Sequence, residues 1–495
     1  MTEPTLRPKI ELLSKKFIRQ IIWEALEILE KKGVFVENKE ALGLFRDRGM
    51  QVDVKSQRVH LTPQLVQDCL ASTPSSIQIY DRSGKNQYDV GGDNLHFDPG
   101  SAAVTILDHK TGQQRLPDTA DVVNFVRVIN SLPNFNFQST GLIASDVPGV
   151  ISDSYRLYLG LLFSTKPLVT GTFRVESFKP MLDMLVAVRG SAKALREKPL
   201  AIFDACPSPP LKWSNLTAQS LIDSARAGIP SELISMGMTG ATSPITIGGT
   251  LVQHVVENLC GLVICQLAKK GAPVIFGGSP SSFDMRKGTT PMGAIETMMI
   301  DSGYAQVAKS LRLPTHAYMG LSDAKTNDSQ AGLESGMGAL LAALSGINVV
   351  SGPGMMDFES CQSLEKLVID NEICGMAYRF IEGIAQREDL LATPLFSNMT
   401  RDMEFLTHPH TRKWLREEHR YPNIIDRDTY DGWVSLGEKP LAERANEEVL
   451  RILAETQVDL INDGIRRDLQ DIALAEAEAN DIKALPRLEV LTPAT

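Results

Sequence analysis

Three short apolar runs in the middle of the chain decide its fold: LAIFDA at residues 200–205, ELISMGMT at 232–239 and PVIFGG at 273–278. Each has the length of a buried strand, and each is followed by a helix-like stretch. Successive runs lie about 30 to 40 residues apart, which is the length of a strand plus a returning helix. The pattern therefore predicts consecutive β-α units.

Five more runs continue this pattern on both sides, at 95–98, 134–140, 168–173, 315–319 and 347–351. Eight strands, each with its own crossover helix, predict an α/β protein whose parallel sheet closes into a (β/α)8 TIM barrel. In that fold the reactive side chains gather where the strands run into the following loops.

The segments that flank the barrel are predicted from local signals. Residues 1–94 are expected to form an N-terminal helical cap with short strands, in which Ser14 caps a first helix and a third helix starts at Thr62 or Pro63. A β-hairpin is expected at 102–116, turning at 110–112. Residues 387–495 are expected to form a C-terminal helical extension that packs on its own barrel or on a neighbouring subunit. The apolar positions that indicate this packing are Val449, Ile452, Leu453, Val458, Leu460 and Ile461.

Composition and charge indicate a cytoplasmic protein. The 43% hydrophobic and 22% charged content is ordinary for a globular chain, and a net charge of −10 argues against nucleic-acid binding. The start of the chain does not have the pattern of a signal peptide, and no apolar stretch reaches the roughly 20 uninterrupted residues of a membrane span. The most apolar helix, near 250–267, contains His254 and Glu257 and is interpreted as a barrel helix. Six scattered cysteines indicate reduced thiols.

Common catalytic motifs do not appear in the sequence. There is no P-loop, no GxGxxG between a strand and a helix, no lysine inside a predicted strand, and no convergent zinc-ligand spacing. The turn SGPGMM at 351–356 could bind a phosphate, although such turns are more often only turns. Asp204 is either used at the mouth or paired there, and His316 is either a core residue or catalytic.

The predicted strand ends are instead rich in aromatic and thioether side chains and poor in charge. Aromatic faces can hold a desolvated quaternary ammonium, while nearby hydroxyls and an arginine could bind a carboxylate on the same ligand. The alternative is that many of these side chains simply fill the barrel, and strand alternation means that only about half of them point inward. The polar candidates for the carboxylate are Ser101, Thr172, Arg174, Ser279 and Ser322.

Several blocks occur together in a specific order. They are ALEILEKKGVFVEN (25–38), SPITIGGTLVQHVVENLCGLVICQL (243–267), PVIFGGSPSSFDMRKG (273–288), GLSDAKTNDSQAGLESGMGALLAALSGINVVSGPGMMD (320–357) and LEKLVIDNEICGM (364–376). In these blocks the chain resembles the trimethylamine methyltransferase family of corrinoid-dependent enzymes, over nearly its whole length.

The resemblance implies a TIM barrel that moves a methyl group from a methylamine or a betaine to the Co(I) of a separate corrinoid protein, in one-carbon metabolism of the methanogenic type. Some members carry pyrrolysine at the barrel centre, and this chain does not. It is therefore similar to members that use quaternary amines such as glycine betaine. A quaternary ammonium leaves as a neutral tertiary amine, so the site needs no general acid or base.

These considerations predict a site at the barrel mouth, a homo-oligomer, and a cobalamin (corrinoid) that the partner protein supplies and this chain does not bind tightly. No metal site, nucleic acid or membrane partner is expected. The alternatives are a barrel lyase or isomerase on a phosphorylated substrate, and a non-catalytic binding protein for methylated amines. The residues predicted to orient the reaction are Asp204, His316 and Asp323, and those predicted to bind substrate are Phe97, Phe173, Arg174, Met238, Phe276, Ser279, Tyr318, Ser322 and Ser351.

Overall fold

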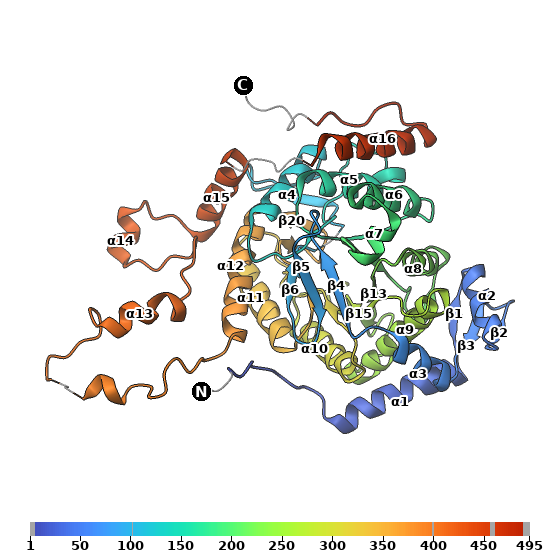
Figure 1. The fold of residues 1–495 in the computed structure, drawn as a ribbon, viewed down its shortest axis with the longest axis horizontal. Helices are drawn as coiled ribbons and strands as arrows, with labels where there is room; N and C mark the ends of the chain where they lie inside the picture. The colour runs from blue at the N-terminus through green and yellow to red at the C-terminus, as the bar shows by residue number, and fades with distance from the viewer. Residues whose placement is uncertain (1–4, 101, 398–399, 456–460, 489–495) are drawn as a thin grey trace.

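The computed structural model describes residues 5–488 except 101, 398–399 and 456–460. Eight short parallel strands form its centre (Figure 1). These strands are β6 (His96–Asp98), β9 (Gln138–Ser139), β10 (Leu168–Gly171), β11 (Ala201–Ala205), β13 (Ser231–Ser235), β15 (Val274–Gly278), β17 (His316–Ala317) and β18 (Val349–Ser351). Seven of them lie within predicted runs, and β13 begins one residue before its run, at Ser231.

Strand pairing closes the barrel. One sheet has the order β15-β13-β11-β10-β9 and another the order β17-β18-β6. The two sheets meet at one seam through a parallel bridge between Phe276 and Thr315. At the other seam the amide of Asn136 donates to the carbonyl of Phe97 at 2.9 Å. The fold prediction of a (β/α)8 barrel is confirmed.

A ring of helices surrounds the strands, one or two after each of them. They are α4 (Thr119–Ser131), α5 (Ser152–Phe163, preceded by the 3-10 turn η1, Gly149–Ile151), α6 (Phe178–Arg189), α7 (Ala192–Glu197), α8 (Asn215–Ala227), α9 (Ile247–Ala268), α10 (Ile295–Ser310), α11 (Ser329–Leu344) and α12 (Leu364–Ile381). Among the described residues, α9 alone is long and apolar enough to cross a membrane, and 89% of its most apolar window is buried. The interpretation of α9 as a barrel helix is confirmed.

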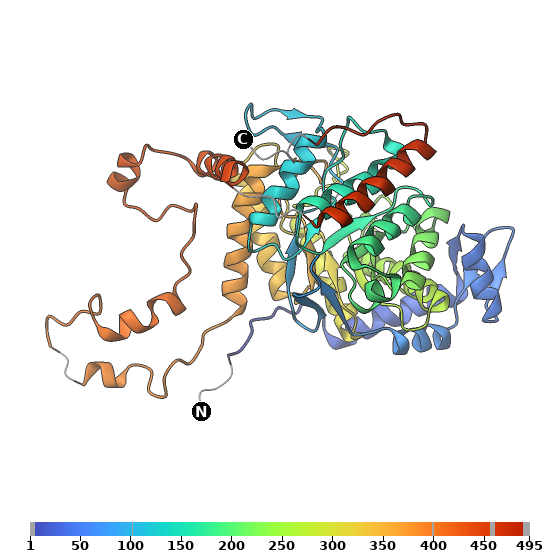
Figure 2. The ribbon, with the colours of Figure 1, turned by 45° about the horizontal axis from the view of Figure 1, so that its top comes forward.

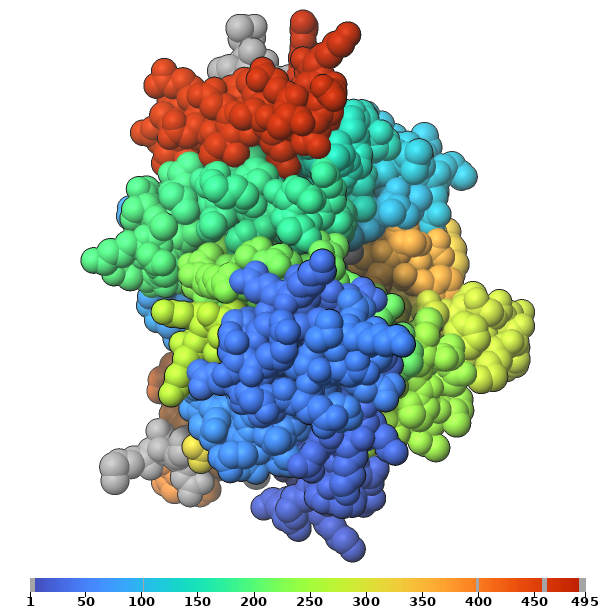
Figure 3. Space-filling model, turned by 90° about the vertical axis from the view of Figure 1, so that its right-hand side faces the viewer, coloured from blue at the N-terminus to red at the C-terminus, as the bar shows by residue number. Residues whose placement is uncertain are grey.

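The N-terminal cap covers α9. Its helices are α1 (Lys15–Lys31), α2 (Lys39–Asp47) and α3 (Pro63–Ser72), and its strands are β1 (Val34–Val36), β2 (Gln51–Asp53) and β3 (Arg58–His60), joined by β12 (Lys212–Trp213). As predicted, the Ser14 side chain caps α1, where it accepts from the amide of Phe17. All three cap helices contact α9, and Figure 3 shows the cap in blue over the green barrel helices.

A β-hairpin closes the end of the barrel at which the strands begin. It consists of β4 (Ser76–Tyr80) and β5 (Gln87–Gly91). Its apolar side chains pack against the inward-facing lower residues of the barrel strands, and burial of each contributes about 1.5–3 kcal/mol. The cluster contains Ile77, Ile79 and Val90 of the hairpin with Phe137, Val169, Ile202, Ile275 and Val349 of the barrel. A ligand can therefore enter only from the opposite end, where the strands finish.

The loops at that open end contain short strands of their own. The hairpin predicted at 102–116 forms as β7 (Thr105–Leu107) and β8 (Gln114–Arg115) and pairs with β20 (Cys361–Ser363), which pairs with β19 (Met355–Met356). A further pair is β14 (Met238–Thr239) with β16 (Ser281–Ser282). Short sheets thus brace the long loops of the mouth.

The C-terminal extension has two parts. Helices α15 (Leu441–Glu455) and α16 (Asp463–Ala479) pack on the chain's own barrel, against α12 and α4 and against α5 and α6. Residues 384–440, which we call the arm, contain η2 (Thr393–Phe396), α13 (Pro409–Glu418) and α14 (Tyr430–Ser435) and extend beside the barrel (Figures 1 and 2). Of the predicted packing positions, Val449, Ile452 and Ile461 are buried, whereas Val458 and Leu460 lie outside the described residues.

Candidate functional site

A cavity of about 540 Å³ opens at the mouth of the barrel, where the strands end. A volume of this size suits a small-molecule ligand. Its wall comes from the ends of six strands (β9, β10, β11, β13, β15 and β17), from the loops after them, and from α5 and α8. The wall residues that the following argument uses are Arg156, Phe173, Asp204, Ser279, Tyr318 and Glu359.

The interior beneath the cavity is acidic. Asp204 lies directly opposite Glu232 in the pairing of β11 with β13, and both side chains point into the barrel. Asp98 and Glu232 are fully buried. Among the described residues Oδ2 of Asp98 has no hydrogen-bond partner, whereas the Glu232 carboxyl forms a hydrogen bond with that of Asp204. Burial raises the pKa of Asp204 to about 7, although the hydrogen bond with Glu232 and the charge of Arg156 act in the opposite direction. Burial also raises the pKa of Glu232 and Asp98 well above the usual range.

A hydrogen-bonded chain links the buried histidine to this acidic group. The Ser351 hydroxyl donates to Asp98 Oδ1 at 2.7 Å and lies 3.0 Å from His316 Nε2. His316 Nε2 is also 3.8 Å from a Glu232 oxygen. Burial lowers the pKa of His316 to about 3, so the imidazole is neutral at pH 7. Neither His316 nor Ser351 lines the cavity. Both lie below it, where they contact the carboxyls of Glu232 and Asp98.

A buried arginine provides the opposite charge. Every residue of α5 is buried, and Arg156 reaches from this helix into the cavity wall. Its guanidinium donates to the carbonyls of Ser152 and Thr140 and lies 4.6 Å from the centre of the Phe173 ring. Burial lowers the pKa of Arg156 to about 10, which leaves it charged at neutral pH. A positive group and several carboxyls thus share one small cavity.

The fourth carboxyl is held by a strained loop. Asp357, Phe358 and Glu359 follow one another with positive φ angles of 49°, 57° and 66°. Non-glycine residues rarely adopt this conformation, and it costs on the order of 1–3 kcal/mol per residue, so such strain clusters at functional sites. The loop places Glu359 in the cavity wall, where Ser279 Oγ lies 3.3 Å from a carboxyl oxygen. Burial raises the pKa of Glu359 to about 8.

The structure brings five of the predicted site residues to the cavity, namely Thr172, Phe173, Asp204, Ser279 and Tyr318. Phe97 and Phe276 are not among them. Side chains alternate along a strand, and these two rings face the outer helices. Phe97 packs edge-on against Tyr378 of α12 at 5.3 Å, and the Phe276 ring is 5.6 Å from that of His254 on α9.

Four other predicted residues hold the surrounding loops and do not line the cavity. Arg174 donates to the Val150 carbonyl at 3.0 Å, and Ser322 donates to Glu334 at 2.5 Å. Asp323 accepts from two backbone amides of the 292–293 turn at 2.9 and 3.0 Å. Met238 belongs to β14, while its neighbour Met236 lines the cavity. Ser101 lies outside the described residues.

The expectation that the cavity is aromatic and carries few charges is also corrected, because Arg156, Asp204 and Glu359 lie in its wall. Two of the cavity's aromatic rings already have a protein cation on one face, because Arg156 lies over Phe173 and Lys325 over Phe358 at 3.9 Å. The negative charge available to a ligand comes mainly from the carboxyls.

Sequence reasoning missed Arg156, Glu232 and Glu359. A charge inside a predicted strand could have revealed Glu232, and an arginine within a continuously apolar helix could have revealed Arg156. No local signal indicates Glu359, because its place depends on the strained loop.

The glycine turn after β18 does not present free amides to an anion. The Gly354 amide donates to the Asp370 carboxylate at 2.7 Å, and that of Gly352 donates to the Asp98 carbonyl at 3.4 Å. A buried carboxylate at this turn disfavours a phosphate, which weakens the alternative of a phosphorylated substrate. Within the described part of the chain, no three His, Cys, Asp or Glu side chains are arranged to hold a metal ion.

A closed parallel barrel with a buried, charged cavity at its C-terminal mouth is the arrangement of (β/α)8-barrel enzymes. The fold is similar to that of the crystal structure of the Methanosarcina barkeri monomethylamine methyltransferase, with a TM-score of 0.52 and 13% identity over 97% of this chain and 90% of that one.

The chain belongs to the trimethylamine methyltransferase family, whose model matches residues 3–479. It is 32% identical to a trimethylamine methyltransferase of Desulfitobacterium hafniense, over 90% of each chain. It is 31% identical to a glycine betaine methyltransferase of that species, over 86% of this chain and 89% of the relative. The chain is therefore a methyltransferase of the methylamine and betaine type.

Proposed function

We propose that this enzyme transfers a methyl group from a small quaternary ammonium zwitterion of the betaine type to the Co(I) of a separate corrinoid protein. The observation that carries the choice of substrate is the presence of Arg156 and the carboxyls of Asp204 and Glu359 in one cavity wall. The Arg156 guanidinium donates to two backbone carbonyls and keeps further N–H groups. A betaine carboxylate can bind these groups, whereas a ligand that carries only a trimethylammonium group offers them no acceptor. One relative bears the name of a glycine betaine methyltransferase, which agrees with this proposal.

The two charged ends of the substrate fix its orientation. Arg156 binds the carboxylate, in the role that the sequence suggested for Arg174. Asp204 and Glu359 neutralise the ammonium, with the Tyr318 ring alongside. Holding both ends leaves one methyl group directed towards the open mouth, which is the positioning contribution to catalysis.

The reaction requires no proton transfer at nitrogen. The C–N bond of one methyl group breaks, its electron pair remains on nitrogen as the lone pair of a neutral tertiary amine, and the methyl group bonds to Co(I), which supplies two electrons. The acceptor belongs to the partner protein, and this chain's residues bind the ammonium, orient it and exclude water.

The corrinoid partner is expected to dock on the mouth, because the rim there is apolar and accessible. Val104, Phe173 and Met236 line the cavity and are exposed by 50%, 42% and 42%. An exposed apolar rim around a ligand site is typical of a protein-docking surface. We also propose a cytoplasmic location, since all six cysteines are free thiols.

Calorimetric titration followed by turnover tests the function. Purified enzyme is titrated with glycine betaine, proline betaine, carnitine and trimethylamine, and then incubated with a Co(I) corrinoid protein while the methyl-cobalt absorbance is recorded. We expect betaines to bind more tightly than trimethylamine and to give methyl-cobalt. Saturable binding without methyl-cobalt would indicate a binding protein, and tighter binding of trimethylamine would refute the zwitterion assignment.

A further inference from the structure

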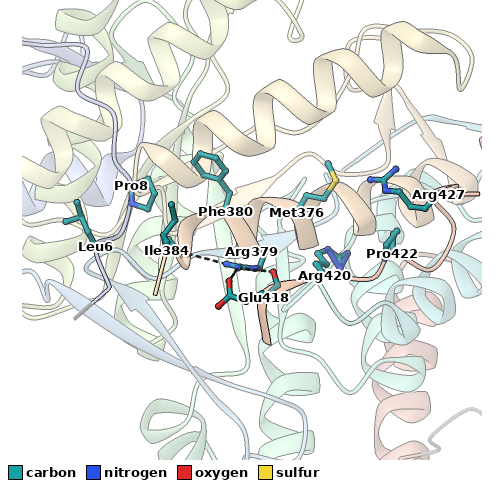
Figure 4. A pocket seen from close by; sticks show the side chains of 11 residues that line it. Leu6, Pro8, Met376, Arg379, Phe380, Ile384, Glu418, Arg420, Pro422 and Arg427 are labelled. Atoms are coloured by element: carbon teal, nitrogen blue, oxygen red, sulfur yellow. Dashed lines mark hydrogen bonds and ion pairs between the residues drawn. The ribbon is translucent and has the colours of Figure 1, made fainter. Parts of the chain in front are cut away.

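An apolar groove of about 660 Å³ lies on the flank of the barrel, where α12 ends and the arm begins (Figure 4). Leu6 and Pro8 of the N-terminal segment form one side, and Met376, Phe380 and Ile384 form its floor. Phe380 is 52% exposed and Ile384 is 95% exposed. Helices of a barrel run opposite to the strands, so the end of α12 lies far from the cavity mouth. A partner docked at the mouth would not cover this groove.

The arm provides a matching apolar surface. Neither α13 nor α14 has a single buried residue, so the arm has no core of its own. Near its start the arm exposes Leu390, Leu391 and Phe396 by 63%, 68% and 46%. Monomeric proteins rarely leave such clustered apolar side chains in contact with water.

We infer that the groove receives the arm segment 389–396 of a second copy of this chain, and that two copies exchange arms reciprocally. The chain's own segment is excluded, because the arm's root at Ile384 and its return at Arg420–Arg427 already form the groove walls. The return segment is fixed there, since Arg420 pairs with Glu372 at 2.7 Å and Glu418 with Arg379 at 3.6 Å.

Charge complementarity supports this occupant. Segment 389–396 contains one acidic side chain, Asp389, and no basic one. The groove wall contains Arg379, Arg420 and Arg427, and among the described residues Arg427 has no carboxylate partner. Every copy has both a groove and an arm, so two copies related by a two-fold axis can each place an arm in the groove of the other.

Analytical ultracentrifugation of the full-length chain at about 10 μM, a concentration at which a standard-size interface is occupied, tests the inference. We expect wild type and the matched control Val54→Asp, whose side chain is 59% exposed on the remote cap, to sediment as two chains or a multiple of two. The arm variant Leu390→Asp/Leu391→Asp and the groove variant Phe380→Glu should each sediment at half the wild-type mass. Circular dichroism spectra should match wild type, because all three side chains are exposed. A monomeric wild type, or either variant retaining the wild-type mass, would overturn the inference.

Cross-linking between differently tagged copies identifies the occupant. One copy carries Phe380→Cys and the other Leu391→Cys, so a disulfide between the introduced thiols must join two chains. We expect a mixed-tag dimer on mild oxidation, absent when Val54→Cys replaces Leu391→Cys. Equal cross-linking in both mixtures, or protection of Cys at position 380 only when the corrinoid protein is added, would refute docking of the arm. Neither measurement depends on the proposed substrate.

Discussion

Replacing Glu359 by glutamine tests the electrostatics of the cavity most directly. The substitution keeps the shape of the side chain and its contact with Ser279, but removes the carboxylate that we propose neutralises the substrate ammonium. We expect the affinity for glycine betaine to fall, and to lose most of its dependence on pH between 7 and 9.

The size of the effect follows from two opposing free energies. Two unit charges about 5 Å apart at an effective dielectric constant of about 20 attract by about 3 kcal/mol. The pKa of Glu359 is about 8, so ionising it at pH 7 costs about 1.4 kcal/mol. The remaining roughly 2 kcal/mol corresponds to about a 25-fold rise in Kd at pH 7. At pH 9 the carboxyl is already ionised, and the variant should bind a few hundred-fold more weakly than wild type, on the same Coulomb estimate.

Isothermal titration calorimetry at pH 7, 8 and 9 measures this, with the exposed Glu197→Gln as the matched control. Wild-type affinity should improve about twentyfold over this range, about tenfold from Glu359 and about twofold from Asp204, whose pKa is about 7. The variant should retain only the roughly twofold change that Asp204 contributes. Folding stability changes with pH in the opposite direction to substrate affinity. The pKa of Glu359 is raised in the folded state, so stability is lost as pH rises towards 8, and Glu359→Gln should unfold at a higher temperature than wild type at pH 9 but not at pH 5. An unchanged pH dependence of Kd in the variant would refute the assigned role.

Two further substitutions separate the observed site from its alternatives. Arg156→Lys should weaken glycine betaine binding by about 10- to 100-fold, since lysine cannot bind a carboxylate through two parallel bonds, while trimethylamine binding stays within twofold. Arg174→Met should change neither Kd, and equal losses in both variants by calorimetry would contradict the assignment. For the fold, a methyl group added at Gly261 would lie 2.4 Å from Trp213. We expect Gly261→Ala to cost about 1–3 kcal/mol in urea unfolding, whereas Gly43→Ala on α2, with nothing within 4 Å, should stabilise slightly. Similar midpoints for the two variants would show that the α9 packing is looser than described.

The sequence predicts the barrel because each strand must be short, apolar and followed by a helix, and these demands repeat eight times. It does not fix which side chains of a strand point inward. In FDA at 203–205, an inward Asp204 requires an outward Phe203, and that ring packs on Phe178 of α6. The same rule applied to Asp98 turns its neighbour Phe97 outward, whereas β15 has no carboxylate that could orient Phe276. Assigning the wrong alternate side chains of a strand to the barrel interior therefore predicts an aromatic cavity where the structure has an acidic one.

The remaining site residues lie beyond such pattern reasoning. Arg156 comes from a helix, and a search of strand ends cannot find it. Glu359 reaches the cavity only because three consecutive residues adopt left-handed backbone conformations, which no feature of their side chains requires. Both depend on tertiary packing that becomes visible only when the barrel is closed.

An acidic cavity raises a question for methyl transfer, because the substrate's positive charge disappears during the reaction. A permanently ionised carboxylate would stabilise the bound cation more than the transition state, and so would tighten binding at the expense of rate. Asp204 and Glu359 have pKa values of about 7 and 8, so at pH 7 Asp204 is about half ionised and Glu359 is mostly protonated, and a bound cation shifts both towards the ionised form. Once the ammonium has become a neutral amine, each can regain a proton at little cost. Burial of these carboxyls thus lets the cavity adjust its charge to the bound species, and a neutral product is not held by an unpaired negative charge.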